Sequence, residues 1–533
     1  MRGAPYGVGR GDARRRRRPG QVHEHSGRSM GMNRRTFLGA AGAGAGLLAA
    51  GRLALATPAA LHAFARRGAE RPPLRFPPNV SPAGLTLAAR PASVDAGGAA
   101  EAAWTFNGGV PGPTIRMRRG ERARVLLENG LAEATIVHWH GLHVPQDADG
   151  HPRLAVAPGA SYRYDFTVDQ RAGTYWYHPH AHLRTAAQTY QGLAGLLIVE
   201  DDEEAALGLP DGEREVLLVL QDRRTDGDGT GAYRYAAAGP DLMHGFLGET
   251  PFGNGVPLPA LEVDAALYRL RVLNAANARV YRLALGTGAP LVVIGNDGGL
   301  LPAPASVPYV DVGPGERVDL LADLSGAAPG DRVMLRSLRF SIPGQMAMGG
   351  MRRGMGRGMS GGMGGGRMGG GSPQGAPMEL LELVVARRSR ERAVLPARLP
   401  AIPSLAGERV AGDRTFSFTS RMMRHTVNGR EFALTRVDER VPIGRLERWT
   451  FVNDDRLAHP VHVHATHFQV VARSGGRGVV LPWERGWKDT VLLLPGERVD
   501  VLLRFDAHRG MFLLHCHNLE HEDGGMMLNF EVD

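Results

Sequence analysis

Four His-x-His pairs, and the equal spacings that precede them, constrain the fold of this 533-residue chain more than any other feature. Near the amino-terminal end, the run RARVLLEN ends at Asn129, and His138-Trp139-His140 begins nine residues later. Near the carboxyl-terminal end, RWTFVN ends at Asn453, and His462-Val463-His464 begins nine residues later. The same kind of run therefore precedes a His pair at the same distance in both places.

A Pro-Gly turn precedes each of the other two pairs. Pro158 opens one turn, and His178-Pro179-His180 begins twenty residues later. Pro495 opens the other, and His515-Cys516-His517 begins after the same interval. Because two independent spacings agree, the chain contains an internal repeat.

A third copy of the repeat, in the middle of the chain, has the spacings without the histidines. RLRVLN ends at Asn274, and nine residues later the chain reads Leu283-Ala284-Leu285. Pro314 opens another Pro-Gly turn, and twenty residues later the chain reads Met334-Leu335-Arg336. We therefore expect three similar domains, with metal ligands in the first and the last.

Short runs that alternate apolar and polar residues between Gly and Pro indicate antiparallel sandwich strands, as in VDVLLRF at 499–505. The predicted fold class is all-β. The predicted segments are a leader at 1–65, domains at 70–208, 209–400 and 401–533, and a Met- and Gly-rich insert at 345–378 within the second domain.

The net charge of +9 is confined to the leader. Residues 1–65 hold 11 Arg but only Asp12 and Glu24 as acids, which leaves 52 basic and 52 acidic residues in the rest of the chain. A neutral body has no field that would recruit polyanions, so we expect no nucleic-acid partner.

The leader resembles a twin-arginine export signal. Arg34-Arg35-Thr36-Phe37-Leu38 opens a Gly- and Ala-rich run to Ala50, and Ala63-Phe64-Ala65 offers a small-residue cleavage site. The run is too short and too weakly apolar for a membrane anchor. We expect export to the periplasm or the outside of the cell by the twin-arginine machinery, and the true start is Met1, Met30 or Met32.

Cys516 is the only cysteine, so an intrachain disulfide is excluded. It lies between His515 and His517, and side chains alternate faces along a strand, so its sulfur points away from the two imidazoles. A thiolate with two imidazoles and a weak thioether forms a blue-copper electron-transfer site, and imidazoles suit copper in general. His459, His521 and Met526 stand at suitable offsets to complete this set. The alternatives are a buried free thiol and histidines scattered in a His-rich protein, which leave four equal spacings to chance.

Four sequence blocks carry a resemblance to a known family. HWHG (138–141), YWYHPHAH (175–182), HPVHVH (459–464) and HCHNLEHEDGGMM (515–527) resemble the copper motifs of the multicopper oxidases, and the likeness is strongest to the bacterial laccase and cuprous oxidase branch. The resemblance covers nearly all of the chain after residue 75. It implies three cupredoxin-like Greek-key β-sandwich domains, with a trinuclear copper site between the first and the third.

The resemblance also implies four copper ions and their ligands. The implied ligands are His459, Cys516, His521 and Met526 for type 1 copper, His138 and His462 for type 2 copper, and His140, His178, His180, His464, His515 and His517 for the type 3 pair.

Reduction of dioxygen to water consumes four electrons and four protons, so carboxylates near the cluster are needed as relays. Asp149 lies nine residues after His140, and Glu522 follows His521. Both positions resemble the acidic pair of the family, and the alternative for each is an ordinary solvated loop acid.

The electron donor is less constrained. Residues 345–368 contain seven Met among Gly and Arg, and thioethers select Cu(I), so this segment is either a copper-gathering loop or a spacer. Asp455, four residues before His459, matches an acid of the family's cuprous substrate site, although Leu457 stands where a Met is expected. Phenols and aromatic amines are the other candidate donors.

The predicted function is oxidation of Cu(I) or of a phenolic or aromatic donor, one electron at a time, coupled to reduction of dioxygen, with a role in copper tolerance. The alternatives are a non-catalytic copper-binding relative, which would lack ligands and above all the cysteine, and a copper nitrite reductase, which does not need eight cluster histidines.

Overall fold

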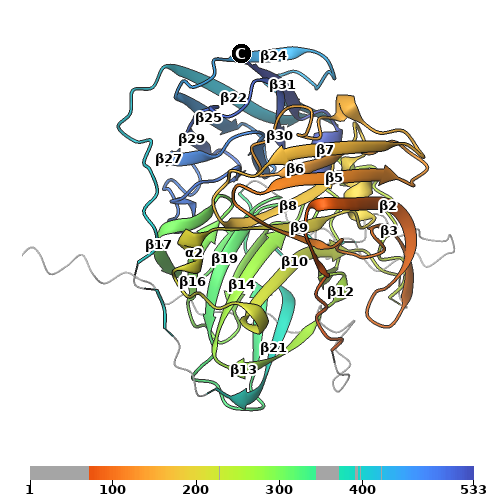
Figure 1. Cartoon of the computed structure of the whole chain (residues 1–533), viewed down its shortest axis with the longest axis vertical. Coiled ribbons are helices and arrows are strands. Elements are labelled where there is room, and N and C mark those ends of the chain that lie inside the picture. Colours follow the sequence, from red (N-terminus) through yellow and green to blue (C-terminus); the bar gives the residue numbers. More distant parts are fainter. Residues whose placement is uncertain (1–70, 227–228, 344–370, 390–393, 397, 422) are drawn as a thin grey trace, which may run out of the picture. The chain divides into compact units, whose positions relative to one another are not determined.

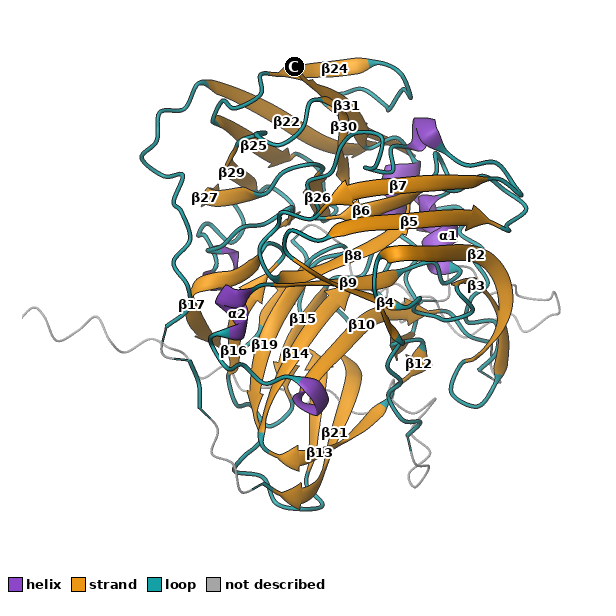
Figure 2. Cartoon of the chain, viewed as in Figure 1, coloured by secondary structure: helices purple, strands orange, loops and turns teal. Residues whose placement is uncertain are grey.

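The structure is a computed structural model that describes residues 71–533 except 227–228, 344–370, 390–393, 397 and 422. The predicted leader and most of the predicted Met-rich insert therefore lie outside the described residues. Strands far outnumber helices in the described chain, and the helices are short (Figure 2). This confirms the predicted all-β fold class.

The first sandwich, residues 79–200, contains two sheets with strand orders β1-β4-β9-β8-β6 and β3-β2-β5-β7. Its strands are β1 Asn79–Val80, β2 Ala83–Asp95, β3 Ala100–Phe106, β4 Thr114–Arg118, β5 Arg122–Asn129, β6 Val137–His140, β7 Ser161–Thr167, β8 Gly173–Pro179 and β9 Gly195–Glu200. Its helices are η1 Pro152–Leu154 and α1 Thr185–Tyr190. Two more short helices, α2 Asp202–Ala205 and η2 Gly212–Arg214, lie between this sandwich and the next.

The middle sandwich, residues 215–388, contains sheets with orders β12-β11-β10-β14-β19-β16-β17 and β13-β21-β20-β15-β18. Its elements are β10 Glu215–Arg223, α3 Pro240–His244, β11 Thr250–Gly253, β12 Val256–Pro257, β13 Ala260–Ala265, β14 Leu267–Asn274, β15 Tyr281–Leu285, β16 Leu291–Asn296, β17 Gly299–Val307, β18 Val310–Val312, β19 Arg317–Asp323, β20 Arg332–Ser337 and β21 Met378–Arg388.

The third sandwich, residues 412–532, contains sheets with orders β23-β22-β25-β29-β27 and β24-β31-β30-β26-β28. Its elements are β22 Gly412–Arg421, β23 Arg424–Val427, β24 Val437–Val441, β25 Glu447–Asn453, β26 His459–Val463, β27 Phe468–Ser474, η4 Pro482–Glu484, β28 Thr490–Leu493, β29 Arg498–Leu503, β30 Gly510–Cys516, α4 Leu519–Asp523 and β31 Met527–Val532. The predicted domain boundaries fall between these three sets of strands and stay predictions.

The sequence repeat has a structural counterpart in strand pairing. The strand before each nine-residue interval (β5, β14 or β25) runs parallel to one strand (β2, β10 or β22) and antiparallel to the strand after the Pro-Gly turn (β7, β19 or β29). All eight residues of β14 are buried, whereas β5 alternates the exposed Arg124 and Glu128 with the buried apolar Val125 and Leu127. Each such side chain contributes roughly 1.5–3 kcal/mol to the free energy of folding through burial of apolar surface.

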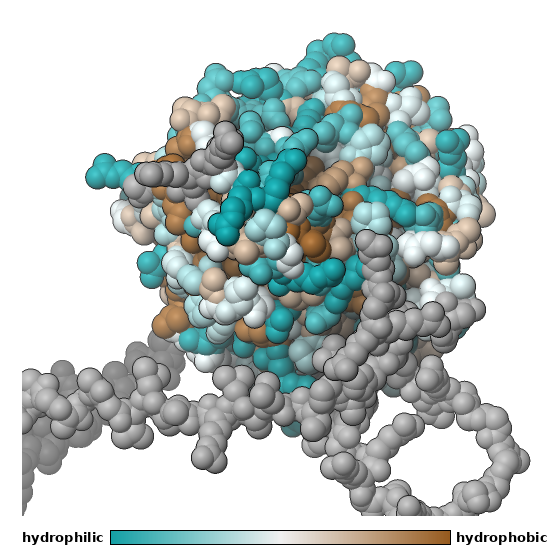
Figure 3. Space-filling model, turned by 90° about the horizontal axis from the view of Figure 1, so that it is seen from below, coloured by the Kyte–Doolittle hydropathy of each residue, from teal (hydrophilic) through white to brown (hydrophobic). Residues whose placement is uncertain are grey.

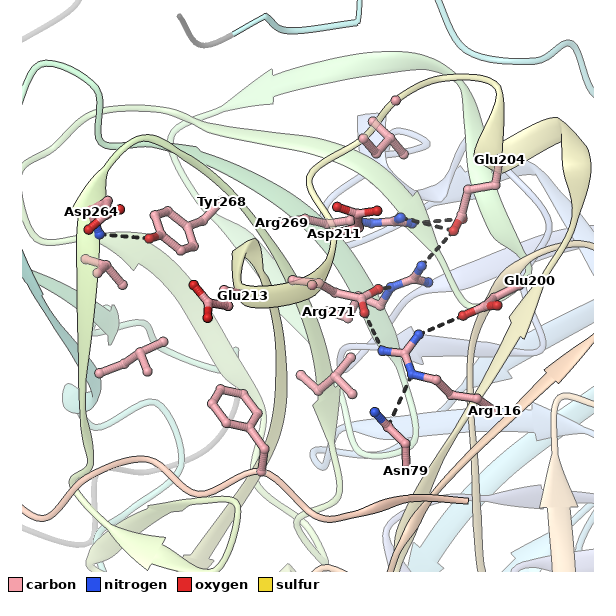
Figure 4. A pocket seen from close by; sticks show the side chains of 18 of the residues that line it. Asn79, Arg116, Glu200, Glu204, Asp211, Glu213, Asp264, Tyr268, Arg269 and Arg271 are labelled. Carbon is pink, nitrogen blue, oxygen red and sulfur yellow. Dashed lines mark hydrogen bonds and ion pairs between the residues drawn. The ribbon is translucent and has the colours of Figure 1, made fainter. Parts of the chain in front are cut away.

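A ladder of buried ion pairs joins the first and middle sandwiches at a pocket of about 990 Å³ (Figure 4). Arg271 of β14 forms ion pairs with Glu204 of α2 at 2.7 Å and with Glu215 of β10 at 2.6 Å. Arg116 of β4 pairs with Glu215 as well, and Arg269 pairs with Glu204. These lining residues include none of the predicted metal ligands.

The molecular face around the lower end of the middle sandwich mixes hydrophilic and hydrophobic residues in small groups (Figure 3). Within the described residues, the helices include none with the length and hydropathy needed to cross a membrane.

Candidate metal centre

The four His-x-His pairs lie on adjacent strands of two sheets. In the first sandwich β6 pairs with β8, which sets His138 opposite His178. In the third sandwich β26 pairs with β30, which sets His462 opposite His515. These two sheets lie side by side in Figure 1, and the Nε2 atoms of His138 and His462 are 3.3 Å apart across the boundary.

The predicted ligands gather into small buried groups whose ligand atoms lie within 4.8 Å of one another. The groups without a carboxylate are His138, His140 and His462; His140, His178 and His517; His180, His464 and His515; and His459, Cys516 and His521. Two of these groups together contain the six histidines predicted for the type 3 pair. His140 also lies close to the two histidines expected for type 2 copper.

Hydrogen bonds on the outer side of the rings fix which nitrogen faces inward. The Nδ1 atom of His138 donates to the Asp149 carbonyl at 2.6 Å, and that of His462 donates to the Asp489 carbonyl at 2.9 Å. Each Nε2 atom therefore carries a free lone pair, and the two lone pairs point at one place. This arrangement fits a metal ion held by two imidazoles.

The group of His180, His464 and His515 shows the same convergence. The Nε2 atom of His515 lies 3.3 Å from that of His180 and 3.1 Å from that of His464. The Nδ1 atom of His464 donates to the Asp149 carboxylate at 2.8 Å, so its Nε2 atom is unprotonated. Three imidazole nitrogens converge here on a point that a cation would occupy.

The group of His140, His178 and His517 leaves ring nitrogens without partners. Among the described residues, the Nε2 atom of His178, the Nδ1 atom of His140 and both nitrogens of His517 are buried with no hydrogen-bond partner. His140 is turned the other way from His138, because its Nε2 atom lies 3.0 Å from the Asp489 carboxylate. Its Nδ1 atom is therefore the one available to a metal ion.

The eight histidines of the four His-x-His pairs are the cluster histidines, and five of them are neutral at ordinary pH. Burial lowers the pKa of His178 to about 3, and burial together with the neighbouring imidazoles lowers the pKa values of His138, His180, His464 and His517 well below the usual range. Neutral imidazole is the form that ligates copper. The buried, unpartnered nitrogens therefore fit copper ions.

The site around the cysteine lies on the other face of β30. The Cys516 sulfur is 3.5 Å from Nδ1 of His459 and 3.8 Å from Nδ1 of His521, and these two nitrogens are 3.2 Å apart. Met526 is fully buried and belongs to the same apolar cluster as Cys516. Burial raises the pKa of the Cys516 thiol, so a bound cation is needed to hold it as thiolate. Two imidazoles, a thiol and a thioether fit copper.

The predicted acids each contact a cluster or cysteine-site histidine. Asp149 is fully buried, which raises its pKa well above the usual range, and it accepts the hydrogen bond of His464. Glu522 lies 3.1 Å from Nδ1 of His515 and 3.6 Å from Nδ1 of His180. Asp455 lies 2.9 Å from Nε2 of His459.

Sequence reasoning missed Asp489, which is fully buried beside the cluster. Its carboxylate contacts His140, accepts a hydrogen bond from the Thr490 hydroxyl at 2.8 Å and pairs with Arg317 of the middle sandwich at 2.8 and 2.6 Å. Burial acts to raise the pKa of Asp489, but the positive charge of Arg317 and the hydrogen bonds from Arg317 and His140 hold it well below its usual range. The sequence signal was weak, because Asp489 belongs to neither repeated spacing.

The chain is similar to known proteins of one family. Multicopper oxidase family profiles match residues 89–204 and 408–533. A laccase of Bacillus subtilis is 29% identical over 80% of this chain and 90% of its own length. The cell division protein FtsP of Escherichia coli is 33% identical over 73% of this chain and 76% of its own length.

A solved structure has a similar fold over nearly the whole chain. It is the laccase-like multicopper oxidase CueO of an Ochrobactrum species, whose oxidase activity extends to lignin model compounds. Its TM-score is 0.75 at 31% sequence identity, and the match covers 86% of this chain and all of that one.

Proposed function

The chain belongs to the multicopper oxidase family, and we propose that it holds four copper ions and oxidises Cu(I) ions or phenolic and aromatic amine donors. It is an oxidoreductase that requires copper, dioxygen and a reducing substrate. The observation that carries the proposal is the complete donor set: ten His, one Cys and one Met meet in neighbouring buried groups.

The proposed ligands follow the groups described above. His459, Cys516, His521 and Met526 hold type 1 copper, His138 and His462 hold type 2 copper, and the other six cluster histidines hold the type 3 pair. Bound copper supplies one-electron acceptance from the substrate and four-electron reduction of dioxygen to water.

The chain itself connects the two sites. Cys516 precedes His517 and follows His515, so only a few covalent bonds separate the sulfur from the cluster imidazoles. A covalent route of this length supports electron transfer from one face of β30 to the other.

Protein groups cover the rim of the cysteine site, where a donor would deliver its electrons. Asp455 covers the Nε2 atom of His459, and the Met243 carbonyl accepts the hydrogen bond from Nε2 of His521 at 3.0 Å. Since both ring edges are covered, we propose outer-sphere transfer, with Asp455 as the acid that a cationic donor meets. Such transfer tolerates donors of many shapes.

Asp149 and Glu522 are the proposed proton relays. Each is buried within hydrogen-bond reach of a cluster imidazole: Asp149 contacts His464, and Glu522 faces His515. General acid catalysis needs such a group at the reacting atoms or one water away.

Two other functions are less well supported. The likeness to FtsP favours a role in cell division, but such a role does not require an intact donor set. A nitrite reductase would leave the three-histidine groups unexplained.

The test is copper content with oxygen uptake. We expect four copper ions per chain, intense visible absorption and oxygen consumption in the parent, and loss of the absorption and of turnover in Cys516→Ser. Two or fewer copper ions per chain, or a Cys516→Ser protein as coloured and active as the parent, would overturn the proposal.

A comparison of donors addresses the substrate. Oxygen consumption is measured with Cu(I), Fe(II) and a phenol, in the parent and after deletion of residues 345–368, which lie mostly outside the described residues. A copper-gathering role predicts a loss confined to Cu(I). If the Cu(I) rate and its concentration dependence survive the deletion, this role is wrong.

We also propose export through the twin-arginine machinery, which the Arg34-Arg35 leader supports, and a role in copper tolerance, which the seven Met of residues 345–368 support. Replacing both arginines by Lys is expected to keep the protein in the cytoplasm, as cell fractionation would show. Normal export of that variant would refute the proposed route.

A further inference from the structure

A third histidine follows the first pair of each copper-bearing repeat at the same interval. His143 lies three residues after His140, and His467 lies three residues after His464. Neither belongs to the metal-ligand groups described above. The fold brings the two together across the boundary between the first and third sandwiches, with ring centroids 4.5 Å apart and ring planes at 63°.

The two rings present lone pairs that nothing in the described chain uses. The Nε2 atoms of His143 and His467 are both buried, and neither has a hydrogen-bond partner among the described residues. The His467 side chain is only 9% exposed. A pair held together for packing alone would leave two polar atoms without partners, which native interiors avoid.

Both imidazoles are in the form that binds metals. Burial lowers the pKa of His467 to about 4, and burial together with the neighbouring His467 lowers the pKa of His143 well below its usual range. The separation of the two ring centroids is close to that of His180 and His515 in the cluster, whose centroids are 4.9 Å apart.

The surroundings favour a single positive charge. The nearest carboxylate oxygen, Oδ2 of Asp489, is 3.8 Å from Nε2 of His467 and already accepts a hydrogen bond from Arg317. Lys488 binds Asp297 and Glu316 beside it, so the buried charged groups comprise two cations and three carboxylates. A monovalent ion meets no excess positive charge there, whereas a divalent ion would lack a free carboxylate.

We propose that His143 and His467 form an additional binding site for one soft monovalent metal ion, Cu(I), outside the trinuclear cluster. Two neutral imidazoles suit copper, and the charge of the site suits the cuprous state. Asp489 lies between this pair and His140, so the site is placed to receive copper next to the cluster. The inference concerns ion binding and does not rest on the proposed oxidase activity.

The test uses Ag(I), which shares the charge and softness of Cu(I) and is not oxidised by the enzyme. Copper-loaded protein is equilibrated with Ag(I), passed through a desalting column, and analysed for silver and copper by mass spectrometry. His143→Gln, His467→Gln and the double variant are each expected to bind one Ag(I) fewer than the parent, with unchanged copper content. One shared ion predicts the same loss from either substitution and no further loss from both.

Two controls make the result decisive. His182→Gln, at an exposed His that packs on Phe432, is expected to retain the parent's silver count. Thermal unfolding shows whether each variant is folded. Parental silver binding by the folded single variants, or loss of two ions from the double variant, would overturn the proposal. Silver ions bound at other places, including the Met-rich insert, are present in the parent and in every variant, so they do not affect the difference in silver count between them.

Discussion

The partner of the outer ring nitrogen determines how each cluster histidine can bind a metal. In the first pair, His138 donates to a backbone carbonyl through Nδ1 and presents Nε2, whereas His140 meets the Asp489 carboxylate with Nε2 and presents Nδ1. A carboxylate partner also raises the basicity of the imidazole that it holds. The two members of one His-x-His pair are therefore chemically different, which strand alternation alone would not predict.

The two buried acids give a prediction about proton supply. Asp149→Asn and Glu522→Gln keep the size and hydrogen-bonding shape of the side chains but remove the acid. We expect the oxygen consumption rate to fall roughly 100-fold or more in each, in the range that general acid catalysis contributes. Copper content and visible absorption should stay at the parent's level.

The matched control for this prediction is Asp165→Asn, which removes an exposed carboxylate paired with Arg122 on the surface of the first sandwich. Steady-state oxygen uptake at saturating donor distinguishes the variants. A relay variant that turns over as fast as the Asp165→Asn control would show that its acid carries no protons for the reaction.

The buried side chain of His151 leads to a prediction about how the free energy of unfolding depends on pH. It is fully buried and neutral, with Nε2 donating to the Asn529 side chain at 2.8 Å, and burial lowers its pKa to about 4. In the unfolded chain its pKa is about 6.5, so the unfolded state takes up the proton first as pH falls. The stability that His151 contributes is present above about pH 6.5 and is lost between there and pH 4, on the order of 3 kcal/mol.

Denaturant unfolding at pH 7, 5.5 and 4 measures this effect. In His151→Gln the free energy of unfolding should fall less steeply over this range than in the parent. The same substitution at the exposed His244 is the control and should leave the slope unchanged. Equal slopes in the parent and in His151→Gln would contradict the assigned burial effect.

At the scale of the structural element, the middle repeat lacks ligands but contributes to the shape of the site. Its Pro-Gly turn places Gly315 against the cluster, where an added Cβ atom would lie 2.8–3.1 Å from three ring atoms of His517. The equivalent glycines of the outer repeats, Gly159 and Gly496, have nothing within 4 Å of that position. One turn in three is therefore constrained by the metal centre.

This difference gives a prediction with built-in controls. All three glycines have positive φ (83°, 75° and 74°), so Ala costs each turn a similar backbone strain of about 1 kcal/mol. Only Gly315→Ala also places a methyl group against the ring of His517. We expect the copper affinity or the oxygen uptake of this variant to fall about 10- to 100-fold. Gly159→Ala and Gly496→Ala should retain both. Equal behaviour of the three variants, by copper analysis and oxygen uptake, would mean that the turn does not position His517.

Local spacing accounts for what the sequence predicted well at this scale. The strands before the His pairs, the Pro-Gly turns and the alternation of Cys516 with its neighbours follow from residues close together in the chain. The fold class was predicted on these grounds, and it is confirmed. The spacing could not indicate that the turn of the middle repeat, at Gly315, would meet the ring of His517 about two hundred residues later.

At the scale of the whole molecule, contacts between sandwiches were the part that the sequence left open. Arg317 and Asp489 are 172 residues apart and meet only because β19 of the middle sandwich faces the third sandwich. His143 and His467 likewise become a pair only when the first and third sandwiches pack together. A single sequence contains no local pattern that marks such partners, since each looks like an ordinary charged or polar residue in its own segment.

The ion-pair ladder between the first and middle sandwiches yields a prediction about the stability of the assembled chain. Arg271 is buried and holds the carboxylates of Glu204 and Glu215. Burial acts to raise the pKa of Glu204, but Arg271 and Arg269 overcome it and lower that pKa to about 2. Arg271→Met would leave buried carboxylates without one of their cations, so we expect the free energy of unfolding to fall by about 3–5 kcal/mol.

Arg387→Met is the matched control for the ladder, because Arg387 also pairs with an acid beside the same pocket, Asp264 at 2.7 Å, but is 74% exposed. Water screens an exposed pair, so its loss should lower the free energy of unfolding far less than the loss of Arg271. Urea unfolding at pH 7 measures both variants, and oxygen uptake should persist in the folded fraction of each, since the ladder includes no metal ligand. If the two substitutions reduce the free energy of unfolding equally, the buried ladder does not stabilise the junction between the sandwiches beyond what a surface ion pair provides.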